Sequence, residues 1–255
     1  MAEKAAEGDS CSDVGTGTYL CTMKMSGGWT QYRITEDCPL LRVMAQIPLT
    51  YGIFISGSAA TWMAERSLSH SVPDWNPNDI DVFACLPTAE FNIMVDRYVH
   101  MLSTHCEATV QRRCSSVVDV AFANCPYTQS FIRCPPLSSA DDIVQNFDIN
   151  ICTPIIVTED KALWVKMKND VASSIRDRRM RCVVRKRNPE YLSYPFKKTL
   201  HRLRKYVARG YGFASLTFES TTHLDFPELA ENSTLNVDDF DMECVMSRLK
   251  RIRPN

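Results

Sequence analysis

The run DIDVFACL at residues 79–86 limits the fold of this chain more than any other segment. Its first four residues alternate acidic and apolar side chains, which is the period of a β-strand with one buried face. Asp79 and Asp81 therefore project from one side, with Cα atoms about 6 to 7 Å apart. Two carboxylates held in this way repel each other unless a cation lies between them, and Mg²⁺ binds such oxygen ligands. An exposed strand without a metal is the common alternative, but the apolar neighbours favour a buried one.

The segment before this strand predicts a strand, a tight turn and a helix. Residues 51–55 are mostly apolar, Gly57 and Ser58 form the turn, and residues 59–68 are compatible with a helix. Glycine lets a ligand approach the backbone closely, and a helix N-terminus directs free N–H groups at an anion. The alternative is an ordinary turn in which Ser58 caps the helix. Residues 69–78 contain two prolines and predict a loop.

A third acid would complete a metal site with the first two. Asp148 lies in the alternating run at residues 147–152, and Asp119 lies in an apolar run at residues 117–120. An acid inside an apolar β pattern is costly to bury unless it binds something. Both candidates stay open, and we prefer Asp148 because its run leads directly to a strand-to-helix junction.

The rest of the chain predicts a mixed-sheet α+β fold without internal repeats. We expect a hairpin at 18–34, strands at 109–112, 117–123 and 155–157, and helices beginning at Pro39, at Thr88, at Thr158 and at Pro195. The helix at 88–103 has a stripe of Phe91, Met94 or Val95, Tyr98 and Leu102. The helix at 158–175 has a stripe of Leu163, Met167, Val171 and Ile175.

The charge is concentrated in one part of the chain. Lys and Arg number 29 against 30 Asp and Glu, yet residues 176–209 hold thirteen Lys and Arg and two acids, a net +11. Within this stretch Lys198, Arg202, Lys205 and Arg209 share one face of a helix, which suits a triphosphate. The density of charge indicates an anionic partner such as RNA, and a solvated basic face is the alternative.

Composition and the N-terminal residues exclude other classes. No apolar run approaches the ~18 residues of a membrane span, and the start MAEKAAEGDS has no apolar core of a signal peptide. We therefore expect no membrane contact and a cytoplasmic protein, with the nucleus as the alternative. The 11 cysteines contain no C-x-x-C pair, so we expect reduced thiols rather than a metal-thiolate site.

Gly57-Ser58, the D-x-D pair and the single strand-borne Asp148 together resemble the nucleotidyltransferase superfamily, which has the DNA polymerase β-like fold. The pattern R-x-x-K-Y-x-x-R-G-Y at residues 202–211 also resembles a helical element of nucleotidyltransferase-like proteins of large viruses. The resemblance covers roughly residues 40–160, and the helical part extends to about 215. One departure is the 20 residues between Ser58 and Asp79, which make 69–78 an insertion.

The resemblance implies a fold, a site and a reaction. It implies a nucleotidyltransferase-type mixed sheet with flanking helices (38–157), followed by the basic helical region (158–218). Turn signals and charge add an N-terminal segment with a β-hairpin (1–37) and an acidic tail that ends in a short basic segment (219–255). Gly57 and Ser58 would hold the phosphates of a nucleoside triphosphate (NTP), while Asp79, Asp81 and Asp148 would bind two Mg²⁺ or Mn²⁺ ions.

The implied reaction is transfer of a nucleoside monophosphate from the NTP to a hydroxyl. The basic stretch favours an RNA 3′ end as acceptor, with a protein or a small molecule as alternatives. A catalytically inactive member of the fold that binds RNA or serves as a viral structural protein is the alternative function. A structural protein with an accidental motif match is a third, and no oligomeric state is predicted.

Overall fold

A computed structural model of the chain describes residues 23–26, 28–35, 37–104, 106–123, 125–185, 193–219 and 235–236. The predicted N-terminal segment up to residue 22 and nearly all of the acidic tail lie outside these residues. The chain divides into two compact units, which we call the first unit (1–145 and 152–173) and the second unit (146–151 and 174–255). Among the described residues, no helix has both the length and the apolar character needed to cross a membrane.

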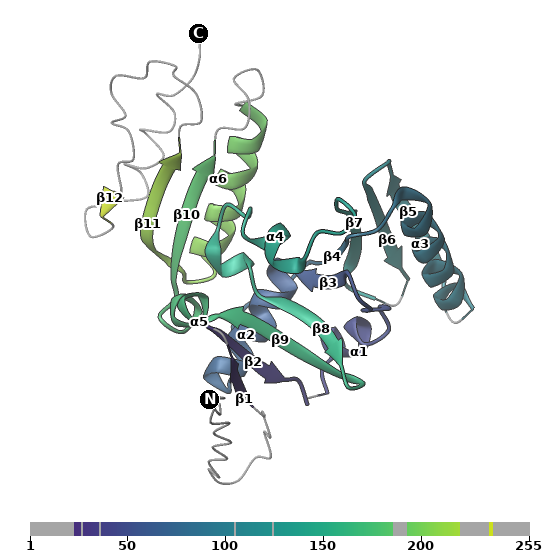
Figure 1. The fold of residues 1–255 in the computed structure, drawn as a ribbon, viewed down its shortest axis with the longest axis horizontal. Helices are drawn as coiled ribbons and strands as arrows, with labels where there is room; N and C mark the ends of the chain where they lie inside the picture. The colour runs from purple at the N-terminus through teal and green to yellow at the C-terminus, as the bar shows by residue number, and fades with distance from the viewer. Residues whose placement is uncertain are drawn as a thin grey trace, which may run out of the picture. The chain divides into compact units, whose positions relative to one another are not determined.

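The first unit is built on a nine-stranded mixed sheet with the order β1-β2-β9-β8-β3-β4-β7-β6-β5 (Figure 1). The strands in that order are β1 (Met23–Ser26), β2 (Trp29–Arg33), β9 (Ala162–Lys168), β8 (Ile155–Glu159), β3 (Ile53–Ser56), β4 (Asp79–Ala84), β7 (Thr128–Arg133), β6 (Val117–Phe122) and β5 (Ala108–Arg113). Only β4 and β7 pair in parallel, and the other neighbours are antiparallel. The predicted mixed-sheet α+β class is confirmed.

The helices of the first unit are α1 (Pro39–Met44), α2 (Ser58–Ser69), α3 (Thr88–Ser103), α4 (Ala140–Val144) and most of α5 (Asn169–Arg176). Helix α3 packs against β5 and β7 and buries Phe91, Val95, Tyr98 and Leu102, and Figure 1 shows it beside β5. The predicted stripe is therefore confirmed, with Val95 rather than Met94 as the buried member.

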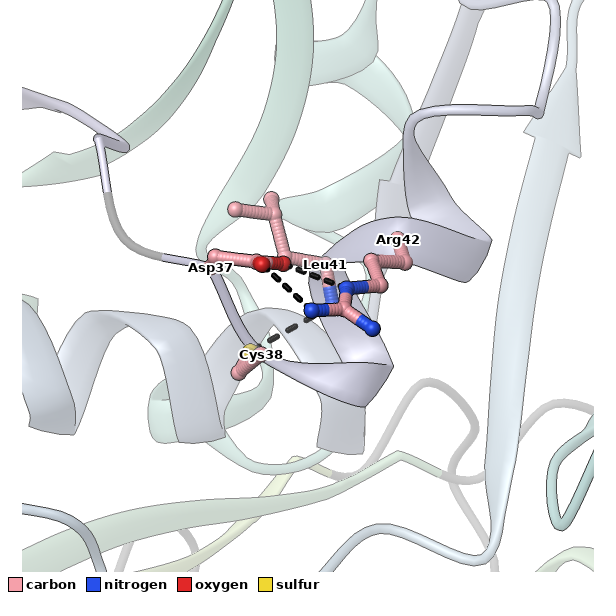
Figure 2. Close-up of polar contacts among 4 residues, drawn as sticks. All are labelled: Asp37, Cys38, Leu41 and Arg42. Carbon is pink, nitrogen blue, oxygen red and sulfur yellow. Dashed lines mark hydrogen bonds and ion pairs between the residues drawn. The ribbon is translucent and has the colours of Figure 1, made fainter.

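Helix α1 begins as the sequence predicts, with Pro39 in its first turn. Figure 2 shows how its start is fixed: the Cys38 sulfur accepts a hydrogen bond from the Leu41 N–H at 3.4 Å, and the Arg42 guanidinium binds Asp37. Proline at this position loses no helical hydrogen bond, since the first N–H groups of a helix have no partner within it.

The helix predicted at 158–175 is wrong in its first half. Thr158 and Glu159 end β8, residues 162–168 form β9, and only α5 is helical. Asp160 and Lys161 both have positive φ, which is the geometry of a tight two-residue hairpin turn. Pairing of β9 with both β8 and β2 outweighs the helical spacing of Leu163 and Met167. The later stripe residues, Val171 and Ile175, are buried on α5.

The second unit contains β10 (Arg179–Arg185), α6 (Ser193–Ala208), β11 (Gly212–Glu219) and β12 (Leu235–Asn236). Strands β10 and β11 are parallel neighbours, and α6 connects them in sequence (Figure 1). The helix predicted from Pro195 to Gly210 is thus observed as α6, and Gly210 follows it with φ +81°. The region predicted as helical also holds strands, because the alternation at 179–183 buries Met180 and Cys182.

Residues 147–152, which we expect to be a strand, pair only briefly. Ile149 forms an isolated antiparallel bridge with Cys182, and Asn150–Cys152 is a short 3-10 helix. Asn150 accounts for the break, since its side chain accepts from the Arg181 N–H at 2.6 Å and donates to Ser174 at 2.9 Å. These side-chain bonds replace the regular backbone pairing of a longer strand.

Candidate functional site

The turn between β3 and α2 is formed by Gly57 and Ser58, as predicted. Gly57 has φ +76°, a conformation that side-chain-bearing residues rarely adopt, and its N–H donates to the Cys152 carbonyl at 3.1 Å. Ser56, fully buried just before the turn, donates to the Pro154 carbonyl at 2.8 Å. The turn is therefore anchored to the chain that leads into β8.

Gly57 lies against the carboxylate of Asp81. A Cβ atom placed on Gly57 would come within 2.8 Å of Asp81 Oδ2. Position 57 thus requires glycine for two reasons: its backbone angles and the closeness of the Asp81 carboxylate. The close approach brings the turn and the second predicted acid together.

Ser58 holds the first predicted acid. As the first residue of α2, it donates a hydrogen bond from Oγ to Asp79 Oδ1 at 3.0 Å. Gly57 rather than Ser58 is the N-cap residue of α2, and no side chain caps this end through a hydrogen bond. The alternative in which Ser58 serves only as a helix cap is therefore wrong.

The two acids share one face of the sheet with further polar residues. Asp81 lies opposite Ser130 on β7, Ser130 opposite Asp119 on β6, and Asp119 opposite Arg112 on β5. Directly paired residues project from the same face of a sheet. The intervening residues Ile80, Val118 and Phe131 project from the other face and are fully buried. A polar row thus runs from the candidate site to the edge of the sheet.

Asp119 is only partly satisfied in this row. Its Oδ2 accepts from Arg112 Nε at 2.7 Å, and its side chain is 17% exposed. Its Oδ1 is buried and has no hydrogen-bond partner within the described part of the chain. A buried carboxylate oxygen without a donor is costly, so this atom is suited to a ligand.

Asp148, the preferred third acid from sequence, belongs to the second unit. Its Oδ2 accepts hydrogen bonds from Thr199 Oγ1 at 2.5 Å and from Arg202 Nη1 at 2.6 Å, both on α6. Its backbone carbonyl accepts from the Val183 N–H at 2.8 Å. The structure therefore joins one predicted metal ligand to one predicted phosphate-binding residue within the second unit.

The predicted basic stripe of α6 is uneven. Arg202 is half-exposed and is paired with Asp148, whereas Arg209 is 8% exposed, with its guanidinium 5.1 Å from the Tyr206 ring centre. Lys205 is half-buried, and the side chain of Lys198 lies outside the described residues. Tyr206 is buried, which agrees with a place in the core, and packs edge-on against Tyr211.

Metal-ligating side chains do not form a ready-made cage. Among the residues that the structure describes, no group of three or more His, Cys, Asp or Glu side chains is close enough to hold a metal ion. The eight described cysteines are free thiols. Burial raises the pKa of Cys134 to about 12, so this thiol is a poor metal ligand and a poor nucleophile at neutral pH.

Sequence reasoning missed three neighbours of the predicted acids. Arg112 and Thr199 contact Asp119 and Asp148, and Ser130 lies opposite Asp81 in the sheet. It also missed the buried Glu65, which accepts from the Trp75 ring N–H at 3.0 Å. This contact fixes the predicted loop before β4 to α2. The only signal for it in the sequence is the tryptophan between the two prolines of the loop.

Comparisons with known proteins give matches to solved structures. No protein-family model matches the sequence, and no curated protein matches it. A CCA-adding enzyme in complex with CTP has 11% identity and a TM-score of 0.45, covering 69% of this chain and 41% of that one. A tRNA-processing enzyme in an apo form has 14% identity and a TM-score of 0.46, covering 71% and 45%. The Thermotoga maritima CCA-adding enzyme complexed with tRNA has 11% identity and a TM-score of 0.44, covering 72% and 40%. The chain spans less than half the length of each.

Proposed function

We propose that the first unit transfers a nucleoside monophosphate from an NTP to a hydroxyl group in a reaction that depends on Mg²⁺ or Mn²⁺. The observation that carries the proposal is the contact of the Gly57-Ser58 turn with both acids of the D-x-D pair. Ser58 binds Asp79 at 3.0 Å, and the missing side chain of Gly57 lets the Asp81 carboxylate lie against the turn. A phosphate-binding turn and a pair of cation ligands are the two parts that this chemistry requires side by side.

The donor set suits a hard divalent cation. Asp79 and Asp81 supply carboxylate oxygens from one face of β4, and the orphaned Oδ1 of Asp119 supplies another on the same face. Mg²⁺ prefers such oxygens and keeps its remaining positions for water and phosphate. When bound, two such ions neutralise the charge that develops on the transferred phosphoryl group and on the attacking and leaving oxygens.

We propose Asp119 rather than Asp148 as the third ligand. Asp119 lies two strands from Asp81, which corresponds to about 9 to 10 Å between Cα atoms, and two aspartates at that separation can hold cations between them. Asp148 is instead engaged by Thr199 and Arg202. Asp119→Asn and Asp148→Asn, each tested alone, distinguish these alternatives.

The chain's own residues bind and orient the nucleotide. The N-terminus of α2, which no side chain caps, would direct its N–H groups at the triphosphate, and Gly57 lets the Asp81 carboxylate lie beside that end of the helix. The hydrogen bond from Ser58 orients Asp79, and the anchoring of Ser56 keeps the turn in place. These contacts position the donor nucleotide, which is the main contribution of a protein to phosphoryl transfer.

An RNA 3′ end is the acceptor that the charge distribution favours. In the second unit, Arg176, Arg179 and Arg204 are exposed, and Arg178 and Arg181 are half-buried. Arginines pair well with phosphates, and RNA binding through them weakens steeply as salt rises. Protein and small-molecule acceptors lack a comparable argument in the described residues.

Label transfer tests the proposal. The full chain is incubated with each α-³²P-labelled NTP, Mg²⁺ or Mn²⁺ and RNA, beside a double variant, Asp79→Ala with Asp81→Ala. The matched control is Asp96→Asn, which changes an exposed acid on α3 that is paired with Arg113. Transfer by the wild type and the control, lost in the double variant, supports the proposal. RNA binding without transfer in any of the proteins would favour the inactive RNA-binding alternative.

A further inference from the structure

We infer that Arg112 is a resident counter-cation of the site: it occupies Asp119 when no divalent ion is bound and moves to a phosphate group of the substrate when the ion binds. This inference rests on the proposed function, and it concerns an arginine that neither the sequence pattern nor the resemblance includes. Three observations support it, namely a bulge in β5, the one-sided contact of Asp119 and a neighbouring arginine that serves as an internal control.

A bulge in β5 turns Arg112 toward the acids. Val110 lies opposite Val120 and Arg112 lies opposite Asp119, so one extra residue, Gln111, interrupts the register between them. In an unbroken strand, Val110 and Arg112 would project from the same face, which is the face of the buried Val120. The bulge places Arg112 on the face of Asp81 instead. Bulges that redirect a side chain are common next to active sites.

The contact between Arg112 and Asp119 is incomplete and exchangeable. The nearest atoms of the pair are Arg112 Nε and Asp119 Oδ2 at 2.7 Å, and Asp119 Oδ1 has no hydrogen-bond partner in the described residues, whereas a two-pronged pair would satisfy both oxygens. The Arg112 side chain is 60% exposed, while Asp119 is 17% exposed. An exposed arginine gains little from such a pair, but the half-buried acid still needs a donor or a cation at Oδ1. A divalent ion fulfils this need better than the guanidinium does.

Arg113 provides the contrast within the same strand. It lies opposite Val118, on the face that packs against α3, and it pairs with Asp96 of that helix at 2.5 Å. Both partners are well exposed, and neither belongs to the polar row. Arg112 and Arg113 thus share a strand and a charge, and each pairs with an aspartate, but they lie on opposite faces and only the partner of Arg112 is mostly buried.

Arg112 would become available when Asp119 turns to the ion. A guanidinium binds phosphate oxygens through parallel hydrogen bonds, so a phosphate of the NTP or of the RNA acceptor is the chemistry that fits it. The exchange needs no large motion, because the arginine lies on an edge strand with most of its side chain in solvent. Arg112 therefore competes with the metal before binding and contributes to substrate binding afterwards.

The first half of the inference is that Arg112 occupies Asp119 when no divalent ion is bound. Mn²⁺ binding to the full chain, measured by electron paramagnetic resonance without substrate, tests it. Arg112→Met should bind Mn²⁺ about two- to fivefold more tightly than the wild type, which is the range expected for loss of one exposed ion pair. Arg113→Met should bind as the wild type does, and Asp119→Asn should bind more weakly. Arg112→Gln repeats the test with a polar side chain, and thermal unfolding verifies that each variant is folded.

The second half of the inference is that Arg112 moves to a substrate phosphate, and steady-state transfer kinetics test it. Arg112→Met should raise KM several-fold for the substrate whose phosphate the arginine binds, NTP or RNA, with Arg113→Met unchanged. Unaltered or weaker Mn²⁺ binding by both folded Arg112 variants would overturn the counter-cation role, and unaltered KM values for both substrates would overturn the release. Failure of the proposed function gives a different result: Asp79→Asn and Asp81→Asn would then bind Mn²⁺ as the wild type does.

Discussion

The two units present acids in opposite ways. In the first unit, Asp79 accepts a hydrogen bond from the Ser58 hydroxyl, and the Asp81 carboxylate lies against Gly57. In the second, Asp148 meets the buried hydroxyl of Thr199 and the guanidinium of Arg202 on a single oxygen. The first arrangement joins two acids to a turn at the start of a helix, and the second joins one acid to a guanidinium. An acid in an apolar run therefore gains its role from what the fold places against it.

Substitution of the two candidates for the third acid should give the largest difference between the two units. We expect Asp119→Asn to lower label transfer at least about 10²-fold, because a cation ligand contributes several kcal/mol to the transition state. Asp148→Asn should retain transfer within about threefold, since the amide oxygen still accepts from Thr199. Both rates are measured at saturating Mg²⁺ and NTP. The reverse order of the two effects would return the third position to Asp148.

Glycine at the turn should be almost as sensitive. Gly57→Ala combines a strained backbone with a contact of 2.8 Å to Asp81 Oδ2, so we expect a loss of about 1 to 3 kcal/mol in unfolding free energy together with most of the transfer activity. Gly28→Ala is the matched control. Its φ of +81° is also positive, but no atom lies within 4 Å of the added Cβ.

Urea unfolding and label transfer on both glycine variants distinguish strain from crowding of the acid. Gly28→Ala should lose stability without losing transfer. Equal losses of transfer in the two variants would show that the space beside Asp81 has no special role.

The loop before β4 should depend on the buried hydrogen bond between Trp75 and Glu65. Trp75→Phe removes the N–H that donates to Glu65, a carboxylate only 5% exposed, and we expect a loss of about 1 to 3 kcal/mol in unfolding free energy. Pairing Trp75→Phe with Glu65→Gln should restore part of the loss, because an uncharged amide is less costly to leave without that donor. Trp29→Phe, on the half-buried Trp29 of β2, is the control. A stability of Trp75→Phe equal to that of the wild type would remove this contact from the explanation of the loop.

The contact between Asp148 and α6 should give the smallest effect. We expect Thr199→Val to cost about 1 kcal/mol in the wild type and clearly less in Asp148→Asn, since a hydrogen bond to a charged group is the stronger one. A double-mutant cycle by urea unfolding measures this coupling. Additive losses would mean that Asp148 does not hold α6 through Thr199, and would weaken the contrast between the two units.

Local patterns predicted the elements that frame the site. The alternation of residues 79–82 identifies β4, the Gly57-Ser58 pair marks the turn before α2, and Pro195 with Gly210 brackets most of α6. Each of these signals acts within a few residues, where backbone preference decides the structure. The spacing of Leu163 and Met167 misled for the same reason, since sheet pairing on both sides of β9 outweighed it.

Contacts between residues far apart in the chain could not be predicted from the sequence. Arg202 reaches Asp148 across 54 residues, and the pairing of Asp119 with Arg112 depends on a bulge that no local pattern marks. The choice between Asp148 and Asp119 depended on such contacts, because both acids lie in similar apolar runs. Strand register, rather than composition, sets which acids share a face.

The decisive measurement compares label transfer from α-³²P-labelled NTP to RNA by the wild type and three single variants: Asp79→Asn, Asp81→Asn and Asp96→Asn. A site formed by the turn and the D-x-D pair predicts transfer by the wild type and by Asp96→Asn, and at least about a 10²-fold loss in the other two. Transfer that persists in folded Asp79→Asn and Asp81→Asn would contradict that site.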